Sequence, residues 1–210
     1  MAEQQWGPIC PALLMIISYS HNFIYFRTKK TGSSTIQEIL KDSCEAQDLY
    51  TGAQTEDMRA HIKAAEVIEM VPQRFWRESF KFTSERHPYE KAVSFAYYRF
   101  GKRQKKGAPL PGDFEKYLDQ VVRRGGYRSV DYYTVSGKVV VDDFIRCESL
   151  GADLKRIGER LGIPIPEELP RKKSTSRLDA RPAREILSEE QKRIIFKGCQ
   201  QEFELLGYEP

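Results

Sequence analysis

From residue 23 the chain reads Phe23-Ile24-Tyr25-Phe26-Arg27-Thr28-Lys29-Lys30-Thr31-Gly32-Ser33-Ser34-Thr35-Ile36. An apolar strand runs directly into a cationic, hydroxyl-rich turn, and the apolar spacing after the turn predicts a helix. The start of a helix carries unpaired backbone N–H groups and a partial positive charge, so it attracts anions. Lys30 adds a full charge, and Gly32 lets the backbone come close to a ligand. The pattern predicts a site for a phosphate or sulfate ester, with hydroxyl donors from Ser33, Ser34 and Thr35.

The position of the glycine in this turn disfavours a nucleoside triphosphatase. A Walker A loop has the form Gly-x-x-x-x-Gly-Lys-Ser/Thr, with its lysine at the helix start, whereas Lys30 precedes the only glycine here. The order of lysine, Thr-Gly, hydroxyl residues and an apolar residue instead resembles the loop that holds the 5′-phosphosulfate of 3′-phosphoadenosine 5′-phosphosulfate (PAPS) in sulfotransferases. The resemblance implies that this group is bound by Lys30, Thr31, Gly32, Ser33, Ser34 and Thr35.

A second segment, residues 80–94, again reads as a strand, a proline-containing turn and a helix. Arg86 closes the strand, and arginine suits phosphate because its planar, permanently charged fork meets two oxygens at once. In sulfotransferases a strand ending in Arg, then Asn-Pro or Asp-Pro, an aromatic residue, and Ser eight residues after the Arg grips the 3′-phosphate. The sequence matches this pattern at Arg86, Pro88, Tyr89 and Ser94.

The match implies that Arg86 and Ser94 bind the 3′-phosphate. Two positions depart from the pattern: His87 stands where the family usually has Asn or Asp, and Lys91 stands where it usually has Arg. Neither of these two residues is assigned a role by the resemblance.

The resemblance extends from about Phe23 to the C-terminus, and it is to the carbohydrate branch (family 2-like) of the PAPS-dependent sulfotransferases. Further segments that are similar to that branch are residues 57–65, 141–150, 161–164, 169–177 and 203–208. The resemblance implies a metal-free, in-line transfer of a sulfuryl group from PAPS to an acceptor hydroxyl, with PAP as the product. A carbohydrate acceptor is expected.

The resemblance also assigns roles within the site. Lys30 would stabilise the bridging oxygen of the leaving group, whereas Lys29 would face solvent. The near-neutral pKa of histidine suits a general base, and His61 is the expected base. Substitutes for it are Glu85, Glu56 and Asp57. A loop that folds over the nucleotide would contribute Lys173, Ser174, Ser176 and Arg177.

Composition sets limits on the class of protein. The chain has 210 residues, a net charge of +4 and a pI near 8.8, which suits one sulfotransferase domain over residues 1–210 and an anionic ligand, but falls short of a nucleic-acid-binding stripe. The four cysteines have neither disulfide nor zinc spacing. The apolar run from Pro8 to Ser18 is too short to span a bilayer and lacks signal-peptide features, so we expect no membrane anchor and a cytoplasmic location.

Strands alternating with helices predict a three-layer α/β fold with a central, mainly parallel sheet flanked by helices, and the resemblance implies that this fold is P-loop-like. Expected strands are Phe23 to Arg27 and Phe80 to Ser84, with a hairpin around Ser136-Gly137, and Leu13 to Ile17 is expected to be a buried strand or a segment that covers the core. Expected helices are 33–41, 58–71, 113–122, 153–161 and 188–206. Residues 101–112 and 171–184 are expected to be loops, and Arg146 and Glu148 an ion pair. Tyr97, Tyr98, Phe100 and Tyr127 are candidates for a sugar-stacking surface, although helical spacing also suits core aromatics.

Two other functions fit parts of the sequence. A nucleotide kinase of related fold would require ATP and Mg²⁺. A non-catalytic anion- or RNA-binding module would use the basic runs at 102–106 and 171–177 and would bind oligonucleotides in a salt-sensitive way. The identity of the acceptor and the oligomeric state are not encoded in any motif that we recognise.

Overall fold

The computed structural model describes residues 15–45, 48–50, 62–110, 112–170, 177 and 179–210. Its centre is a five-stranded sheet in the order β3-β1-β2-β4-β7. β1 pairs antiparallel with both β2 and β3, whereas β2, β4 and β7 pair parallel. β1 therefore runs opposite to the other four strands, and the sheet is mixed but mainly parallel. The strands are β1 (Ile16–Ser18), β2 (Phe23–Phe26), β3 (Leu49–Tyr50), β4 (Phe80–Glu85) and β7 (Asp143–Arg146).

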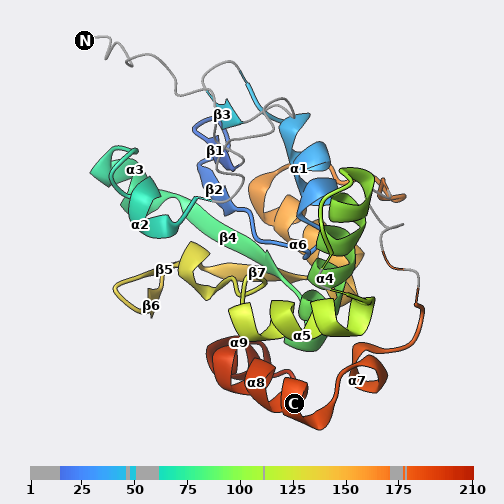
Figure 1. The fold of residues 1–210 in the computed structure, drawn as a ribbon. Helices are drawn as coiled ribbons and strands as arrows, with labels where there is room; N and C mark the ends of the chain where they lie inside the picture. Colours follow the sequence, from blue (N-terminus) through green and yellow to red (C-terminus); the bar gives the residue numbers. More distant parts are fainter. Residues whose placement is uncertain (1–14, 46–47, 51–61, 111, 171–176, 178) are drawn as a thin grey trace, which may run out of the picture.

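The two central strands are buried on both faces, as every residue of β2 and β4 is buried. Alternate side chains enter different cores, because successive residues of a strand point to opposite faces. Phe23 and Tyr25 pack with helices α1 (Ser33–Lys41) and α6 (Leu150–Leu161). Ile24 and Phe26 pack on the other side with α2 (Ala64–Val67) and α3 (Gln73–Glu78). Helices thus flank both faces, and Figure 1 shows these pairs on opposite sides of the sheet.

A third core is made by helices alone. It joins α4 (Pro88–Lys105) and α5 (Phe114–Arg124) to α7 (Ala183–Ile186), α8 (Glu189–Gly198) and α9 (Gln200–Leu206). Figure 1 places α5, α8 and α9 together beyond the end of β4. This packing fixes α4, the helix that follows Arg86, against the rest of the molecule.

Several expected elements are confirmed. The helix over 33–41 has the predicted bounds, and the helix predicted from Asp113 is α5, with the Asp113 side chain capping Lys116 N. The hairpin forms from β5 (Thr134–Val135) and β6 (Lys138–Val139), with positive φ at Ser136 and Gly137, as a tight two-residue turn requires. The strands expected at Phe23 and Phe80 are β2 and β4.

Other expectations were wrong in extent. The loop predicted over 101–112 begins late, because α4 continues to Lys105. The helix predicted over 188–206 is broken at Cys199 into α8 and α9. Of the helix predicted over 58–71, the described part contains only the short α2. In the loop predicted over 171–184, residues 183 and 184 open α7. Within the described part of the chain, no helix is long and apolar enough to cross a membrane.

Candidate functional site

The carboxyl ends of β2 and β4 bring together the two segments that were predicted to bind phosphate groups, residues 23–36 and 80–94, which we call the phosphate-type segments. The strands pair in parallel, with Phe26 opposite Thr83, so the turn after β2 and the arginine after β4 leave the sheet at the same edge. Hydroxyl contacts fasten the two segments. Thr28 Oγ1 donates to the Ser84 carbonyl, and Thr31 Oγ1 lies 2.8 Å from Ser84 Oγ. The segments are thus held against each other through a buried hydroxyl network.

The turn between β2 and α1 has a left-handed backbone at two positions, of which only Lys30 is strained. Lys30 has φ +61° and Gly32 has φ +79°, and the first of these is costly for a residue with a side chain. Gly32 is the N-cap of α1, and no side chain of the described residues caps this helix end. A Cβ on Gly32 would come within 3.3 Å of Leu150 Cδ2. Glycine therefore allows the close approach of α1 to α6 and leaves the helix start accessible to an anion.

Arg27 is a member of this site that the sequence did not reveal. Its Nε and Nη2 donate to the hydroxyls of Ser33 (3.3 Å) and Ser34 (2.9 Å), and its Nη1 donates to Gln37 Oε1 (2.6 Å). Burial lowers the pKa of Arg27. Since Arg27 uses lone pairs of the two serine oxygens, each hydroxyl proton can still be donated to an anion. The only signal for this role was a cation at the end of an apolar strand.

Thr31 and Thr35 use their hydroxyls within the protein. Thr31 is fully buried in the network with Thr28 and Ser84. Thr35 Oγ1 donates to the carbonyl of Pro170 at 2.9 Å. The arrangement leaves the backbone N–H groups of this helix start, rather than these two hydroxyls, as the donors suited to an anion.

The two lysines of the turn differ in their surroundings. Lys30 Nζ lies 4.6 Å from the centre of the Tyr98 ring on α4. Lys29 Nζ donates to the Gly126 carbonyl at 3.1 Å and lies 5.3 Å from the centre of the Tyr132 ring. The expectation that Lys29 simply faces solvent was wrong, because this lysine is half-buried and fastens the turn to the 126–132 segment.

Arg86 and Arg177, 91 positions apart in the sequence, share one carboxylate. Glu90 Oε2 lies 3.2 Å from Arg86 Nη2 and 2.6 Å from Arg177 Nη1. Glu90 Oε1 accepts a hydrogen bond from Ala183 N at 2.7 Å. Burial alone would raise the pKa of Glu90, but the bond from Ala183 and the two arginines outweigh it and lower the pKa. Glu90 is therefore a carboxylate at neutral pH.

α4 carries the remaining parts of the site on one face. Ser94 lies two turns beyond Arg86, and Tyr98, which contacts Lys30, follows it at i+4. Ser94 is half-buried. The structure thus places Arg86, Ser94 and the Lys30 side chain along the same side of α4.

Lys91, the departure from the family pattern, lies in a buried ionic cluster. Its Nζ is 2.5 Å from Glu85 Oε2 and 3.8 Å from Glu202 Oε1, and all three side chains are essentially inaccessible. Burial would lower the pKa of Lys91, but the two carboxylates outweigh it and raise the pKa. Burial raises the pKa of Glu85. Because Glu85 is enclosed and paired, it cannot reach an acceptor hydroxyl, and its candidacy as the general base was wrong.

His87, Arg146 and Glu148 contact the C-terminal residues of the chain or the start of α4. His87 caps α4 by accepting from Tyr89 N, and its Nε2 lies 3.0 Å from the Glu209 carbonyl. Glu148 accepts from His87 N and from Tyr208 Oη, whereas Arg146 lies over the Tyr208 ring. The expected ion pair between Arg146 and Glu148 was therefore wrong.

The candidate aromatic surface is mostly core. Tyr127 is fully buried, and Tyr97 stacks on Phe114 with ring centres 3.9 Å apart. Phe100 packs against Phe114 and Tyr117. Only Tyr98 lies beside the phosphate-type turn. His61, Glu56, Asp57, Lys173, Ser174 and Ser176 lie outside the described residues.

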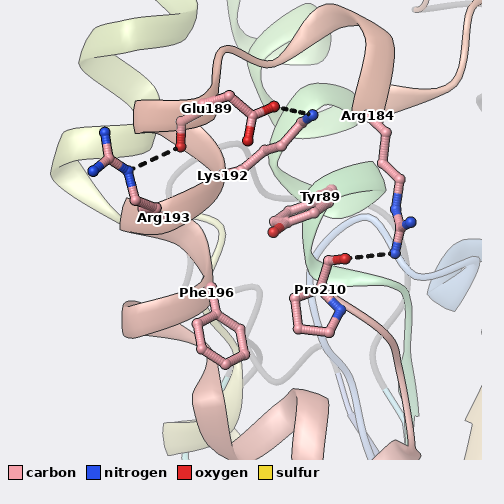
Figure 2. Close-up of a pocket in the computed structure, with 7 residues that line it drawn as sticks. All are labelled: Tyr89, Arg184, Glu189, Lys192, Arg193, Phe196 and Pro210. Atoms are coloured by element: carbon pink, nitrogen blue, oxygen red, sulfur yellow. Dashed lines mark hydrogen bonds and ion pairs between the residues drawn. The ribbon is translucent and has the colours of Figure 1, made fainter.

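A hollow of about 300 Å³ lies elsewhere, between α4, α7 and α8. Figure 2 shows that its cations face partners within the protein: Arg184 donates to the Pro210 carbonyl, Lys192 pairs with Glu189 at 2.7 Å, and Arg193 donates to the Glu189 carbonyl. None of the described residues that were predicted to bind nucleotide lines this hollow. Among the described residues, no group of three or more His, Cys, Asp or Glu side chains is placed to hold a metal ion.

Comparisons of the chain with protein-family models, with curated proteins and with solved structures found no match.

Proposed function

We propose that the protein is a PAPS-dependent sulfotransferase of P-loop-like architecture that transfers a sulfuryl group to a hydroxyl, with a carbohydrate as the expected acceptor. One observation carries the proposal: β2 and β4 are adjacent and parallel, so the Lys30 turn and Arg86 lie at the same edge of the sheet. Ligands of α/β folds bind outside the carboxyl ends of such strands. Two separated cationic segments at this edge suit a nucleotide that carries phosphate groups at two positions.

The residues of the site fit the two ends of PAPS. The uncapped start of α1, with Lys30 and the serine hydroxyls held by Arg27, offers donors for the 5′-phosphosulfate. The guanidinium group of Arg86 can donate two hydrogen bonds to the 3′-phosphate. Two of its nitrogens, Nε and Nη1, have no acceptor among the described residues. Adenosine would then lie across the edge of the sheet, between the two segments.

The reaction would be an in-line displacement at sulfur. The acceptor oxygen forms a bond to sulfur while the bond from sulfur to the bridging phosphate oxygen breaks, and PAP leaves with that oxygen. The proton of the acceptor hydroxyl passes to a base, for which His61 is the proposal. Lys30 would stabilise the charge that develops on the leaving phosphate.

Substitution of Lys30 tests this role. In a turnover assay that follows release of PAP from PAPS with a panel of oligosaccharide acceptors, Lys30→Ala should lower the rate about 10²- to 10³-fold, the usual cost of losing one donor to a developing charge. Lys29→Ala is the matched control, because it removes the same charge from the neighbouring position. Because Lys29 also fastens the turn through the Gly126 carbonyl, its loss should lower the rate by less than about tenfold, the equivalent of one hydrogen bond, and so by much less than the loss of Lys30.

The opposite pattern would contradict the assignment. A larger loss in Lys29→Ala than in Lys30→Ala would place the leaving group on the other lysine. If the protein transferred phosphate from ATP in the presence of Mg²⁺ and showed no turnover of PAPS, the result would support the nucleotide kinase. Salt-sensitive oligonucleotide binding without adenine preference would support the binding module.

A further inference from the structure

Glu90 joins the candidate 3′-phosphate arginine to the C-terminal part of the chain. It lies in the first turn of α4, four residues after Arg86. One of its oxygens contacts both Arg86 and Arg177, and the other accepts the backbone N–H of Ala183. Both oxygens are therefore used, and the side chain is held in one orientation.

Arg177 is fixed even more firmly than Arg86. Its Nε donates to the Asp179 carbonyl at 2.7 Å, its Nη1 to Glu90, and its Nη2 to the Arg181 carbonyl. All three nitrogens thus have acceptors within the protein, and Arg177 is suited to bracing this segment rather than to binding nucleotide through its side chain. Arg86, in contrast, gives a single nitrogen to Glu90 at the longer distance of 3.2 Å.

The cluster of Arg86, Glu90 and Arg177 carries a net positive charge, which favours the binding of an anion. Two guanidinium groups face one carboxylate, so the group keeps a net charge of +1. Arg177 neutralises Glu90, and the charge of Arg86 therefore remains available to a ligand. A free arginine side chain loses rotamer entropy when it is fixed, and a side chain that is already oriented loses less on binding.

We propose that Glu90 positions Arg86 for the 3′-phosphate, with Arg177 as the counter-charge that makes this arrangement possible. This inference rests on the proposed function. It assigns Glu90 no contact with the reacting atoms, so Glu90 is a positioning residue. On binding, the phosphate takes the remaining donors of Arg86, while Glu90 keeps its contacts with Arg177 and Ala183.

A comparison of two nucleotides isolates this role. PAP carries the 3′-phosphate and AMP lacks it, so the ratio of their dissociation constants reports on the contacts to that phosphate, of which Arg86 supplies the charged one. Glu90→Ala should weaken PAP binding about tenfold, the equivalent of one hydrogen bond to a charged group, and AMP binding by less than about twofold. Glu90→Gln keeps an oxygen for the Ala183 N–H and should lower the PAP preference by about threefold, since the ionic part is lost.

The matched control is Glu185→Ala, which removes the same charge from an exposed position on α7, close to the segment that Glu90 holds. Its PAP and AMP affinities should equal those of the wild type. If Glu90→Ala fails to fold, Glu90→Gln carries the test. An unchanged preference for PAP in a folded Glu90 variant, or a higher PAP affinity, would overturn the inference. A wild-type protein that binds PAP no better than AMP would instead overturn the proposed function on which the inference rests.

Discussion

Replacing Arg86 by alanine is expected to weaken PAP binding by about 30- to 150-fold, which corresponds to about 2–3 kcal/mol for lost charge-assisted hydrogen bonds. Arg86 follows the last residue of β4 and carries nitrogens that no described acceptor uses. Binding of AMP should change far less, because AMP has no 3′-phosphate to lose. Calorimetric titration of both nucleotides into the variant measures the two effects.

Arg99→Ala provides the control for this experiment. Arg99 lies on the same helix and is exposed, so its removal alters the net charge by the same amount without touching the edge of the sheet. PAP affinity in this variant should stay within about twofold of the wild type, as expected for a screened surface charge. An equal loss in Arg86→Ala and Arg99→Ala would reduce the role of Arg86 to general electrostatic attraction and would contradict a specific phosphate contact.

Replacing Lys91 by methionine is expected to lower the free energy of unfolding by about 3–5 kcal/mol, the usual cost of leaving a buried charge without its partner. The Lys91 ammonium lies between Glu85 and Glu202, and Ser129 Oγ accepts from it at 3.3 Å. Methionine fills a similar volume but leaves two enclosed carboxyl groups without a cation. Chemical denaturation of the variant at neutral pH measures the loss.

The pH dependence of this loss has a definite sign. Burial raises the pKa of Glu85 above its value in the unfolded chain, and loss of Lys91 raises it further. A folded state that holds a neutral carboxyl group loses stability as the pH rises above the unfolded pKa of about 4.3. The difference between wild type and Lys91→Met should therefore be largest at neutral pH and should shrink as the pH falls toward 4.

Glu202→Gln is a second test of the charge balance in this buried cluster. The cluster contains two carboxylates and one ammonium, so removal of one negative charge leaves a balanced pair, and we expect a change within about 1 kcal/mol, as for an ordinary substitution. Stability unaffected by Lys91→Met, or a larger loss in Glu202→Gln than in Lys91→Met, would contradict this account of the cluster.

Local pattern was sufficient for the elements that surround the site. The glycine at position 32 and the spacing of Ile36, Ile39 and Leu40 predicted the turn and α1 with correct bounds, and the apolar run at Phe23 predicted β2 one residue too long. The parallel pairing of β2 with β4 also followed from the alternation of strands and helices. The strand, the turn and the helix depend on neighbours in sequence, and periodicity reports them directly.

Tertiary packing decided what the sequence could not. α4 continues past Gly101 to Lys105 because Tyr97 and Phe100 pack on Phe114 of α5, and this packing outweighs the low helix propensity of glycine. The partners of Lys91 come from β4 and α9, so its burial was invisible in the motif. Glu90 could have been paired with Arg86 from their i,i+4 spacing, but Arg177 is 87 residues away from it.

The most direct test of the central claim is a calorimetric titration of the wild-type protein with PAP in the presence of EDTA, with ATP plus Mg²⁺ as the comparison ligand. The account predicts metal-independent PAP binding in the micromolar range and a clear preference for PAP over ATP, because the start of α1 and Arg86 provide separate sites for the 5′- and 3′-phosphates. Binding of Mg-ATP in preference to PAP, or no binding of PAP, would contradict the assignment of this sheet edge as a PAPS site.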